Sequence, residues 1–323
     1  MKYLVTGAAG FIGSHLVEAF MRDGDTVVGI DNMNDHYDVA RKEANLAELE
    51  ALDVPGKLEF HRGDILDREL LDSLFHRQRF DAIVHLAAMA GVRNSIDHPA
   101  LYWRVNLEGT RNLLEAMVAT NHPDNRNFVF ASTSSVYGAT EQIPFVETDP
   151  CNAPLVPYSA SKRAAEVMGY SYHHLYKVNF TGVRFFTVYG PRGRPDMMAF
   201  KVLDSIYSGE TVPLNNGGEM YRDWTFVSDT VAGVVAAARN PQAYELINLG
   251  RGEPVKLSDF VAMIEKKMGK QAHFEDARIP VGDIPLTHAD ISKARRLLGY
   301  NPTVSVEEGV DRFVEWYQSA VAD

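Results

Sequence analysis

This 323-residue sequence has a single cysteine, fewer basic than acidic residues and no long hydrophobic run. The thiol of Cys151 has no partner for an internal disulfide and no nearby metal-ligand spacing, so we expect a small buried side chain and no metal site. No apolar run reaches the roughly 18 residues that span a bilayer, which argues against an integral membrane protein. The net charge of −11 disfavours binding to nucleic acid or to an anionic membrane surface.

The first residues, Met1-Lys2, lead directly into an apolar segment and a glycine turn. This leaves no room for the charged region, apolar run and cleavage site of a secretory signal, so we expect a cytoplasmic location. Hydrophobic residues make up 46% of the chain, which at this length is enough for a sizeable packed core. A small anionic ligand is compatible with the net charge, because a few converging arginines can reverse the local potential.

Short apolar segments alternate with longer helical patterns over the first two thirds of the sequence. This rhythm is typical of βαβ units, which build a parallel sheet with helices on both faces. After about Pro191 the pattern loosens, although the short apolar segment Glu245–Leu249 could return to the main sheet. The expected strands are Lys2–Thr6, Thr26–Asp31, Leu58–Arg62, Asp81–Leu86, Asn127–Ser132 and Gly182–Phe186. The expected helices are Phe11–Arg22, Val39–Leu52, Arg68–His76, Leu101–Thr120, Ser159–Tyr176, Asp196–Ser208, Ser228–Arg239, Leu257–Met268, Asp290–Leu298 and Val306–Ala320.

A glycine-rich turn follows the first expected strand and opens the first expected helix. Gly7 permits the tight turn, Gly10 lets the backbone approach a pyrophosphate, and Gly13 allows the helix to pack closely on the strand. The spacing is G-x-x-G-x-x-G, and its position between strand and helix indicates a dinucleotide-binding site. The residues between the last two glycines, Phe11 and Ile12, are expected to line the same site.

The cofactor predicted from these residues is NAD. Asp31 ends the second strand, where a carboxylate can accept hydrogen bonds from both ribose hydroxyls and would repel a 2′-phosphate. The residues after it offer no arginine to bind such a phosphate. Further cofactor contacts are expected at the ends of the second, third and fourth strands, from Asn32, Asp64, Ile65 and Ala87.

These features predict an α/β fold, with a Rossmann-type doubly wound parallel sheet and a smaller C-terminal substrate-binding domain. Residues 1–180 would form the NAD-binding domain, joined by a return segment near 220–250. Residues 181–323 would form most of the substrate domain, which makes the boundary discontinuous.

Tyr158 and Lys162 are four residues apart, so on a helix both side chains point from one face. An ammonium beside the phenol favours the phenolate and would lower the tyrosine pKa toward working pH, as a general base requires. Their helix follows a strand that ends in Ser132-Thr133-Ser134-Ser135, at the sheet edge where ligands bind. His85, at the end of an apolar strand, is expected to be structural.

The chain resembles an extended short-chain dehydrogenase/reductase of the nucleotide-sugar epimerase and dehydratase group over essentially its whole length. Within that group it is most similar to the UDP-glucuronate 4-epimerases, through Arg184–Pro191 with Arg194–Met197, through Gly91–Arg93 and through Met220–Asp223. The wider resemblance is carried by Gly7, Gly10, Gly13, Asp31, Asp64, Thr133–Gly138, Tyr158, Lys162, Arg222-Asp223 and the tail from Gly282-Asp283 to Asp290-Ile291.

The resemblance implies a UDP-sugar acid as substrate and assigns the catalytic roles. Tyr158 would remove the proton of the 4-hydroxyl while carbon 4 gives a hydride to NAD. Lys162 would hold the nicotinamide ribose and tune Tyr158, and Thr133 would hydrogen-bond the 4-oxygen. Ser134 and Ser135 would lie near the sugar carboxylate.

Five arginines are candidates for the negative charges of such a substrate. Arg194 is the first choice for the sugar carboxylate and Arg192 the second, while Arg222 matches the pyrophosphate-binding arginine of the family. Arg93 and Arg278 are further substrate-binding candidates, but Pro280 stands where the family usually has another phosphate-binding arginine. The resemblance also implies a homodimer, in which the helices around 101–120 and 159–176 pair.

Four other functions are alternatives. A UDP-glucuronate decarboxylase of this family typically has glutamate where Ser135 stands, and a 4,6-dehydratase has an Asp-Glu pair at Ser134-Ser135, so both are disfavoured. A 4-epimerase of neutral UDP-hexoses is opposed mainly by the anion-binding arginine. A non-catalytic NAD-binding regulator is opposed by the intact Tyr158, Lys162 and Thr133.

Overall fold

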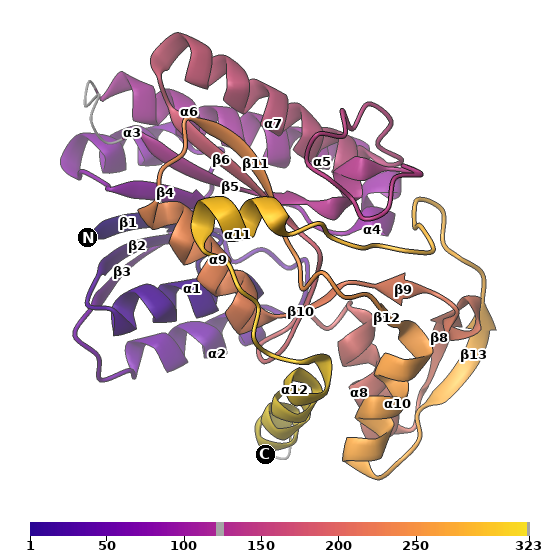
Figure 1. Ribbon diagram of the computed structural model, residues 1–323. Helices are drawn as coiled ribbons and strands as arrows, with labels where there is room; N and C mark the ends of the chain where they lie inside the picture. The colour runs from indigo at the N-terminus through magenta and orange to yellow at the C-terminus, as the bar shows by residue number, and fades with distance from the viewer. Residues whose placement is uncertain (121–125, 322–323) are drawn as a thin grey trace.

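The computed structural model describes residues 1–120 and 126–321, and its centre is a seven-stranded sheet (Figure 1). Every neighbouring pair of strands in it is parallel, in the order β11-β6-β5-β4-β1-β2-β3. The chain builds the sheet outward from β1 through β2 to β3 and then from β4 in the other direction. The reversal lies between β1 and β4, which is where doubly wound folds bind their ligands. The strands are β1 (Lys2–Thr6), β2 (Thr26–Asp31), β3 (Lys57–Arg62), β4 (Ala82–His85), β5 (Asn127–Thr133), β6 (Asn179–Phe185) and β11 (Tyr244–Leu249).

Burial along the strands follows their place in the sheet. The central strands β4 and β5 are buried at every position, as expected for parallel strands covered on both faces. The edge strand β3 alternates between more and less exposed residues instead. The sequence predicted these strands within a few residues, and the predicted Rossmann-type doubly wound sheet is confirmed.

Two helical layers enclose the sheet (Figure 1). One face is covered by α1 (Phe11–Arg22), α2 (Val39–Glu50) and α9 (Val227–Arg239). The other face carries α3 (Arg68–Arg77), α6 (Gly109–Ala119) and α7 (Pro157–Tyr176). The layers enclose two separate groups of buried apolar side chains, one on each face.

One predicted helix differs from its expected form. The sequence pattern predicted a single helix over 101–120, and the structure instead divides the segment into α5 (Pro99–Tyr102), a π-helical stretch from Trp103 to Glu108, and α6. Asn106 explains part of the difference. Its buried amide exchanges hydrogen bonds with the backbone of Met89 and also donates to Ser161 Oγ at 3.1 Å, so it ties this segment to the loop after β4 and to α7.

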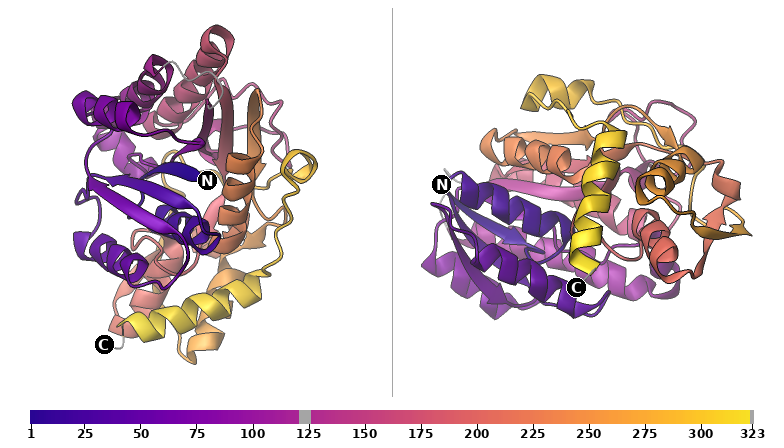
Figure 2. Two further views of the ribbon diagram at one scale, coloured as in Figure 1. Left: turned by 90° about the vertical axis from the view of Figure 1, so that its left-hand side faces the viewer. Right: turned by 90° about the horizontal axis from the view of Figure 1, so that it is seen from below.

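The C-terminal part adds short elements beside the carboxyl edge of the sheet. Its helices are α8 (Met198–Ser208), α10 (Leu257–Met268), α11 (Ser292–Leu298) and α12 (Val306–Val321), with α12 packed against α10 in the view from below (Figure 2). Aromatic side chains fill the core of this part, where Trp224 and Phe260 stack with ring centroids 3.8 Å apart. Three two-stranded sheets were not predicted: β7 (Thr187–Tyr189) with β10 (Trp224–Phe226), β8 (Thr211–Asn215) with β13 (His273–Ala277), and β9 (Tyr221–Arg222) with β12 (Val255–Lys256).

The chain returns from this part to the main sheet. β11 pairs in parallel with β6 at the segment where the sequence predicted a return. β6 itself continues across residue 180 to Phe185, so the sheet extends beyond the predicted boundary. The division into residues 1–180 and 181–323 stays a prediction.

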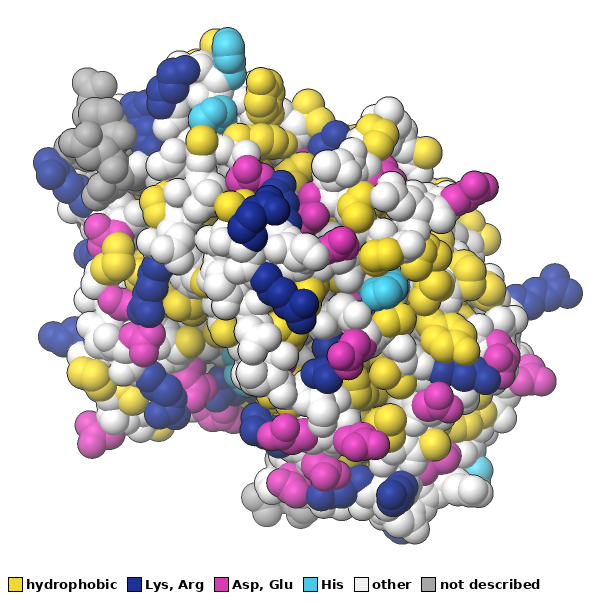
Figure 3. Space-filling view, viewed as in Figure 1, with side chains coloured by type: hydrophobic (Ala, Val, Ile, Leu, Met, Phe, Trp, Pro, Cys, Tyr) yellow, Lys and Arg dark blue, Asp and Glu magenta, His cyan; other side chains and the backbone are white. Residues whose placement is uncertain are grey.

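Two surface properties bear on function. Among the described residues, every helix is too short or too polar to cross a membrane. Acidic and basic side chains are interspersed on the face seen in Figure 3, so the negative net charge is not gathered into one patch there.

Candidate active site

The turn from β1 into α1 fits the pyrophosphate of a dinucleotide. Gly7 has a φ of +72°, and a Cβ there would lie 2.8 Å from the backbone nitrogen of Ala87. A Cβ on Gly13 would lie 1.9 Å from the Gly7 carbonyl oxygen, so the helix can approach the turn only with glycine. α1 starts after Gly10 with no side-chain cap and no acidic residue in its first turn. Its first N–H groups therefore offer a positive helix end to an anion.

The predicted ribose-binding residues come together at the carboxyl ends of β2 and β3. Asp31 is 6% exposed, and its two carboxylate oxygens accept hydrogen bonds from the backbone nitrogens of Met33 and Ala9, at 2.9 and 3.3 Å. Asn32 donates to Asp64 Oδ2 at 2.9 Å. These contacts place acceptors from two neighbouring strands beside the glycine turn, as NAD binding requires.

Sequence reasoning missed one basic residue at this site. Lys42 of α2 is 5% exposed, with Nζ 3.5 Å from Asp31 Oδ1 and 3.1 Å from Asn34 Oδ1. The sequence feature that could have indicated this contact is a lysine at a helix position that faces the sheet, close to the end of the second strand. A lysine there needs a carboxylate partner, and Asp31 is the acid that ends the strand below it.

The three predicted catalytic residues lie where α7 begins and β5 ends. Lys162 is 2% exposed and donates from Nζ to the Ala131 carbonyl oxygen at 2.9 Å. Thr133 is the last residue of β5, and its hydroxyl accepts from the backbone nitrogen of Ser135 at 3.2 Å. Tyr158 is half-buried in the first turn of α7, with its ring centroid 6.1 Å from that of Tyr102. The sheet edge and the helix thus present a phenol, an ammonium and a hydroxyl together.

The pKa values differ from the sequence expectation in one respect. Burial raises the pKa of Tyr158, while the Thr133 hydroxyl and the positive charge of Arg194 act in the opposite direction. Burial also lowers the pKa of Lys162 to about 7, against the opposing effect of the Glu166 carboxylate. The expected lowering of the Tyr158 pKa by Lys162 is therefore not present in the protein without ligands. Desolvation outweighs the effects of Thr133 and Arg194, and Lys162 is not among the described groups that act on Tyr158.

A buried ion pair lies behind the catalytic helix and strand. Glu166, one turn after Lys162, accepts from Ser132 Oγ at 2.6 Å and from Arg184 Nε and Nη2, both at 2.9 Å. Glu166 and Arg184 are fully buried. The network ties α7 to β5 and β6 directly beneath the catalytic residues. Sequence reasoning missed it, although the four-residue spacing from Lys162 placed an acid on the same helix face.

The arginines expected to bind substrate differ in their partners. Arg222 is half-buried and donates to the carbonyl oxygens of Tyr221 and Pro285, without an ion pair to any described carboxylate. Arg194 is paired in two places with Asp196, Nε with Oδ1 at 2.9 Å and Nη2 with Oδ2 at 2.5 Å. Arg222 can therefore bind an anion without first losing an ion pair, whereas Arg194 is already paired with the Asp196 carboxylate.

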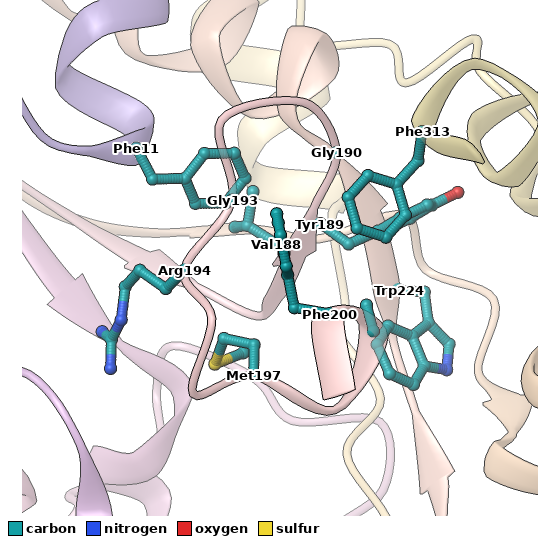
Figure 4. A pocket seen from close by; sticks show the side chains of 11 residues that line it. Phe11, Val188, Tyr189, Gly190, Gly193, Arg194, Met197, Phe200, Trp224 and Phe313 are labelled. Atoms are coloured by element: carbon teal, nitrogen blue, oxygen red, sulfur yellow. The ribbon is translucent and has the colours of Figure 1, made fainter. Parts of the chain in front are cut away.

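Arg194 borders a small pocket between the start of α1 and the C-terminal part. Its guanidinium points away from the apolar side chains there (Figure 4). A Cβ placed on Gly91 would lie 3.9 Å from Arg194 Nη2, so this arginine lies close to the loop after β4. The pocket is lined by Phe11, Val188, Tyr189, Gly190, Gly193, Arg194, Met197, Ala199, Phe200, Trp224 and Phe313.

The other three arginine candidates are placed differently. Arg192 lies between two acids, Glu18 of α1 at 2.9 Å and Glu48 of α2 at 2.7 Å, and its side chain is 10% exposed. These contacts give Arg192 a role in joining the C-terminal part to the N-terminal helices. Arg93 is half-exposed and 3.7 Å from Asp283. Arg278 is exposed and has neither a hydrogen bond nor an ion pair with the described residues.

Two residues considered as possible functional groups have structural surroundings. His85 is 1% exposed between the hydroxyls of Thr6 and Thr110, at 2.7 and 2.9 Å, and burial lowers its pKa. Cys151 is 2% exposed, and burial raises the pKa of its thiol to about 11. The expected burial of Cys151 and the expected hydrogen-bonded position of His85 are confirmed.

Comparisons with known proteins agree with this geometry. The family model described as GDP-mannose 4,6 dehydratase matches residues 4–313. A UDP-glucuronate 4-epimerase of Thermodesulfobacterium geofontis is 41% identical over 315 residues, which cover 97% of this chain and 95% of that protein.

Solved structures of nucleotide-sugar 4-epimerases are also similar to this chain. UDP-glucuronic acid 4-epimerase from Bacillus cereus, in complex with UDP-glucuronic acid and NAD, superposes with a TM-score of 0.88 at 35% identity, over 99% of this chain and 100% of that one. UDP-glucose 4-epimerase from Thermotoga maritima, with UDP-glucose, superposes with a TM-score of 0.90 at 28% identity and the same coverage.

Proposed function

This chain belongs to the GDP-mannose 4,6-dehydratase family of extended short-chain dehydrogenases/reductases, and we propose that it is an NAD-dependent UDP-glucuronate 4-epimerase. It would interconvert UDP-glucuronate and UDP-galacturonate through a 4-keto sugar. The observation that carries the proposal is the convergence of Tyr158, Lys162 and Thr133 at one sheet edge, with the charge of Arg194 acting on Tyr158. The activities of the Thermodesulfobacterium geofontis and Bacillus cereus relatives support the choice of substrate.

The catalytic residues of this chain would move a single proton. Tyr158 would take the proton of the sugar 4-hydroxyl. After the keto-sugar has turned its other face to the cofactor, Tyr158 would return the proton to the 4-oxygen. Thr133 would donate a hydrogen bond to that oxygen, and Lys162 would hold the nicotinamide ribose. Bound NAD would supply the acceptor for the hydride of carbon 4 and give the hydride back. The glycine turn and Asp31 would fix the cofactor at its pyrophosphate and adenosine ribose.

The substrate's charges would be shared between two groups of residues. Arg222 would bind the diphosphate, because it is half-buried and forms no ion pair with a described carboxylate, although the charge of Asp283 acts on it. Arg93 and Arg278 are further candidates. Arg194 would face the sugar carboxylate together with Ser134 and Ser135. Arg192 is less suited to that task, since Glu18 and Glu48 already balance its charge.

We also propose that the protein is a cytoplasmic homodimer. Large apolar side chains on α7 and on the segment before α6 are left exposed, and a second copy of the chain would bury them. The buried single thiol is compatible with a reducing compartment. Light scattering at several protein concentrations tests the dimer, and a monomer at all of them would contradict it. The side chains concerned are Leu101, Trp103, Val167, Tyr170 and Leu175.

The decisive experiment is incubation of the purified protein with UDP-glucuronate and no added cofactor. We expect UDP-galacturonate at constant total nucleotide sugar, because hydride leaves and returns to the same sugar and retained NAD is regenerated. Release of carbon dioxide with a UDP-4-keto-pentose would identify a decarboxylase. Product that forms only after NAD is added, with one NAD consumed per sugar, would identify a net dehydrogenase. Absence of any product, with NAD bound, would favour a non-catalytic role.

A further inference from the structure

Arg194 and Asp196 form an unusual arrangement for an anion-binding site. The substrate-facing arginine and its acidic partner lie in the same turn, which is closed by a hydrogen bond from the Met197 nitrogen to the Arg194 carbonyl oxygen at 3.2 Å. Asp196 takes the Nε and Nη2 edge of the guanidinium. Both side chains come from this short turn, so the carboxylate lies beside the guanidinium without any contribution from a distant segment.

The surroundings of the pair favour its charged form. Burial acts to raise the pKa of the Asp196 carboxyl, but Arg194 holds it below its usual value, and His36 adds a smaller lowering effect. The side chain of Arg194 is 19% exposed and that of Asp196 is 47% exposed. Tyr37, Tyr158, His36 and Tyr102 are further titratable groups that interact with Arg194. The arginine charge is therefore already balanced before a sugar carboxylate arrives.

This balance changes how the site responds to the two classes of sugar. A largely buried guanidinium with no counter-ion would be costly beside a neutral hexose, so such a site would reject neutral sugars strongly. With Asp196 in place, a neutral hexose leaves no unpaired charge behind. A uronate gains less than it otherwise would, since its carboxylate must share Arg194 with Asp196 and is repelled by it.

We propose that Asp196 is an internal counter-carboxylate that sets the charge selectivity of the sugar site, making it tolerant of neutral UDP-hexoses and reducing its preference for UDP-uronates. The inference deepens the proposed function and rests on Arg194 facing the sugar carboxylate. Asp196 acts through Arg194, so it is a positioning residue for specificity. The opposite possibility is that Asp196 only orients Arg194, in which case its removal would weaken uronate binding.

The test compares binding of UDP-glucuronate and UDP-glucose to the NAD-loaded protein by titration calorimetry. Both ligands carry the same diphosphate, so the ratio of their dissociation constants isolates the contribution of the sugar carboxylate. Asp196→Asn removes the charge and keeps the shape and one acceptor for Arg194. We expect the preference for UDP-glucuronate over UDP-glucose to rise roughly tenfold, from tighter uronate binding and weaker hexose binding.

Glu253→Gln is the matched control, because Glu253 pairs with Arg251 two residues before it in the same Arg-x-acid pattern, at 3.0 Å, outside this site. It should leave the ratio unchanged. A second variant, Asp196→Ser, guards against an effect peculiar to asparagine and should shift the ratio in the same direction. An unchanged or reduced preference for UDP-glucuronate in both Asp196 variants would overturn the proposal.

Failure of this inference is distinguishable from failure of the proposed function. The proposed function depends on whether the wild-type protein forms UDP-galacturonate, which is a turnover measurement. The role of Asp196 depends on a ratio of binding constants, which can be measured even where turnover is absent. A wild-type protein that epimerises UDP-glucuronate while both Asp196 variants keep the wild-type ratio would retain the function and reject the inference.

Discussion

The candidate active site has two sides that are built differently. On the sheet side, β5 and α7 carry Thr133, Tyr158 and Lys162, and the supporting ion pair of Glu166 and Arg184 is fully buried. On the loop side, Arg194 and Arg222 come from the C-terminal part. There the supporting contacts are a half-exposed carboxylate, Asp196, and two backbone carbonyls.

The difference follows from what each side has to do. A proton acceptor must be held within hydrogen-bonding distance of one oxygen, and a buried, fully connected network fixes its helix against the strand. The groups that bind the sugar of an epimerase must release it so that either of its faces can meet the cofactor. Contacts near the surface, which are worth little individually, permit that exchange. The buried network therefore supports the residues that move the proton, and the more exposed contacts support the residues that bind the substrate.

The largest expected effect is on the sheet side, at the base itself. Tyr158→Phe removes the proton acceptor and leaves the ring, so turnover of UDP-glucuronate should fall by about 10²–10⁴-fold. The substrate dissociation constant should change little, because the loop side is intact. Steady-state kinetics with calorimetry separates the two quantities. A mutant that keeps most of its turnover would remove Tyr158 from the role of base.

The next effect tests the buried support. Glu166→Gln leaves the fully buried Arg184 without its counter-ion, and the free energy of unfolding should fall by about 3 kcal/mol. Urea denaturation monitored by circular dichroism measures it. Adding Arg184→Met should recover part of the loss, because the double variant no longer buries an unpaired charge. A loss below about 1 kcal/mol in the single variant would mean that the sheet side tolerates the loss of an ion-pair partner as well as the loop side does.

A smaller effect is expected on the loop side. Arg194→Ala should weaken UDP-glucuronate binding by about 2 kcal/mol, since a charge-assisted contact to the carboxylate is lost. Binding of UDP-glucose should weaken much less, and the unfolding free energy should hardly change. Calorimetry with both ligands gives the comparison. Equal losses for the two ligands would place Arg194 away from the carboxylate.

The two sides should also differ in their response to pH. The folded-state pKa of Lys162 is lowered to about 7, below the value of an exposed lysine, so the unfolded chain binds more protons above that pH. Stability from this group therefore increases as the pH rises, by about 1 kcal/mol between pH 7 and pH 8.

The arginines of the loop side do not titrate in this range and contribute nothing to the slope. Denaturation of the protein without ligands at both pH values should show the increase. The Lys162→Met variant should lack that component, whereas an identical slope in the variant would assign the pH dependence to other groups.

The smallest effect provides the baseline. Arg312 and Glu308 form an exposed pair one turn apart on α12, at 2.6 Å. Glu308→Gln should change the unfolding free energy by less than about 0.5 kcal/mol and leave kinetics unaltered. A larger loss of unfolding free energy would mean that exposed ion pairs also stabilise this protein. The effect of Glu166→Gln would then not distinguish buried from exposed support.

Much of the fold could be predicted from local patterns. The bounds of β1, β2, α1 and α10 agree with the sequence prediction at both ends, because apolar periodicity and adjacent glycines mark them within a few residues. The short strands of the C-terminal part were missed. β9 and β12 are two residues long and exist only because distant segments pair, which no local pattern records.

The sequence by itself determined the glycine turn, the acid after the second strand and the Tyr-Lys spacing, since each depends on neighbouring residues along one strand or helix. Only the tertiary structure decided which charges are already balanced. Arg192 meets Glu18 and Glu48 from helices more than 140 residues away in sequence, and Arg184 meets Glu166 across a strand and a helix. Arg222 forms no such ion pair with the described residues, and only the charge of Asp283 acts on it. The sequence does not distinguish these arginines, because the free energy of each charge depends on the carboxylates and the burial that folding brings to it.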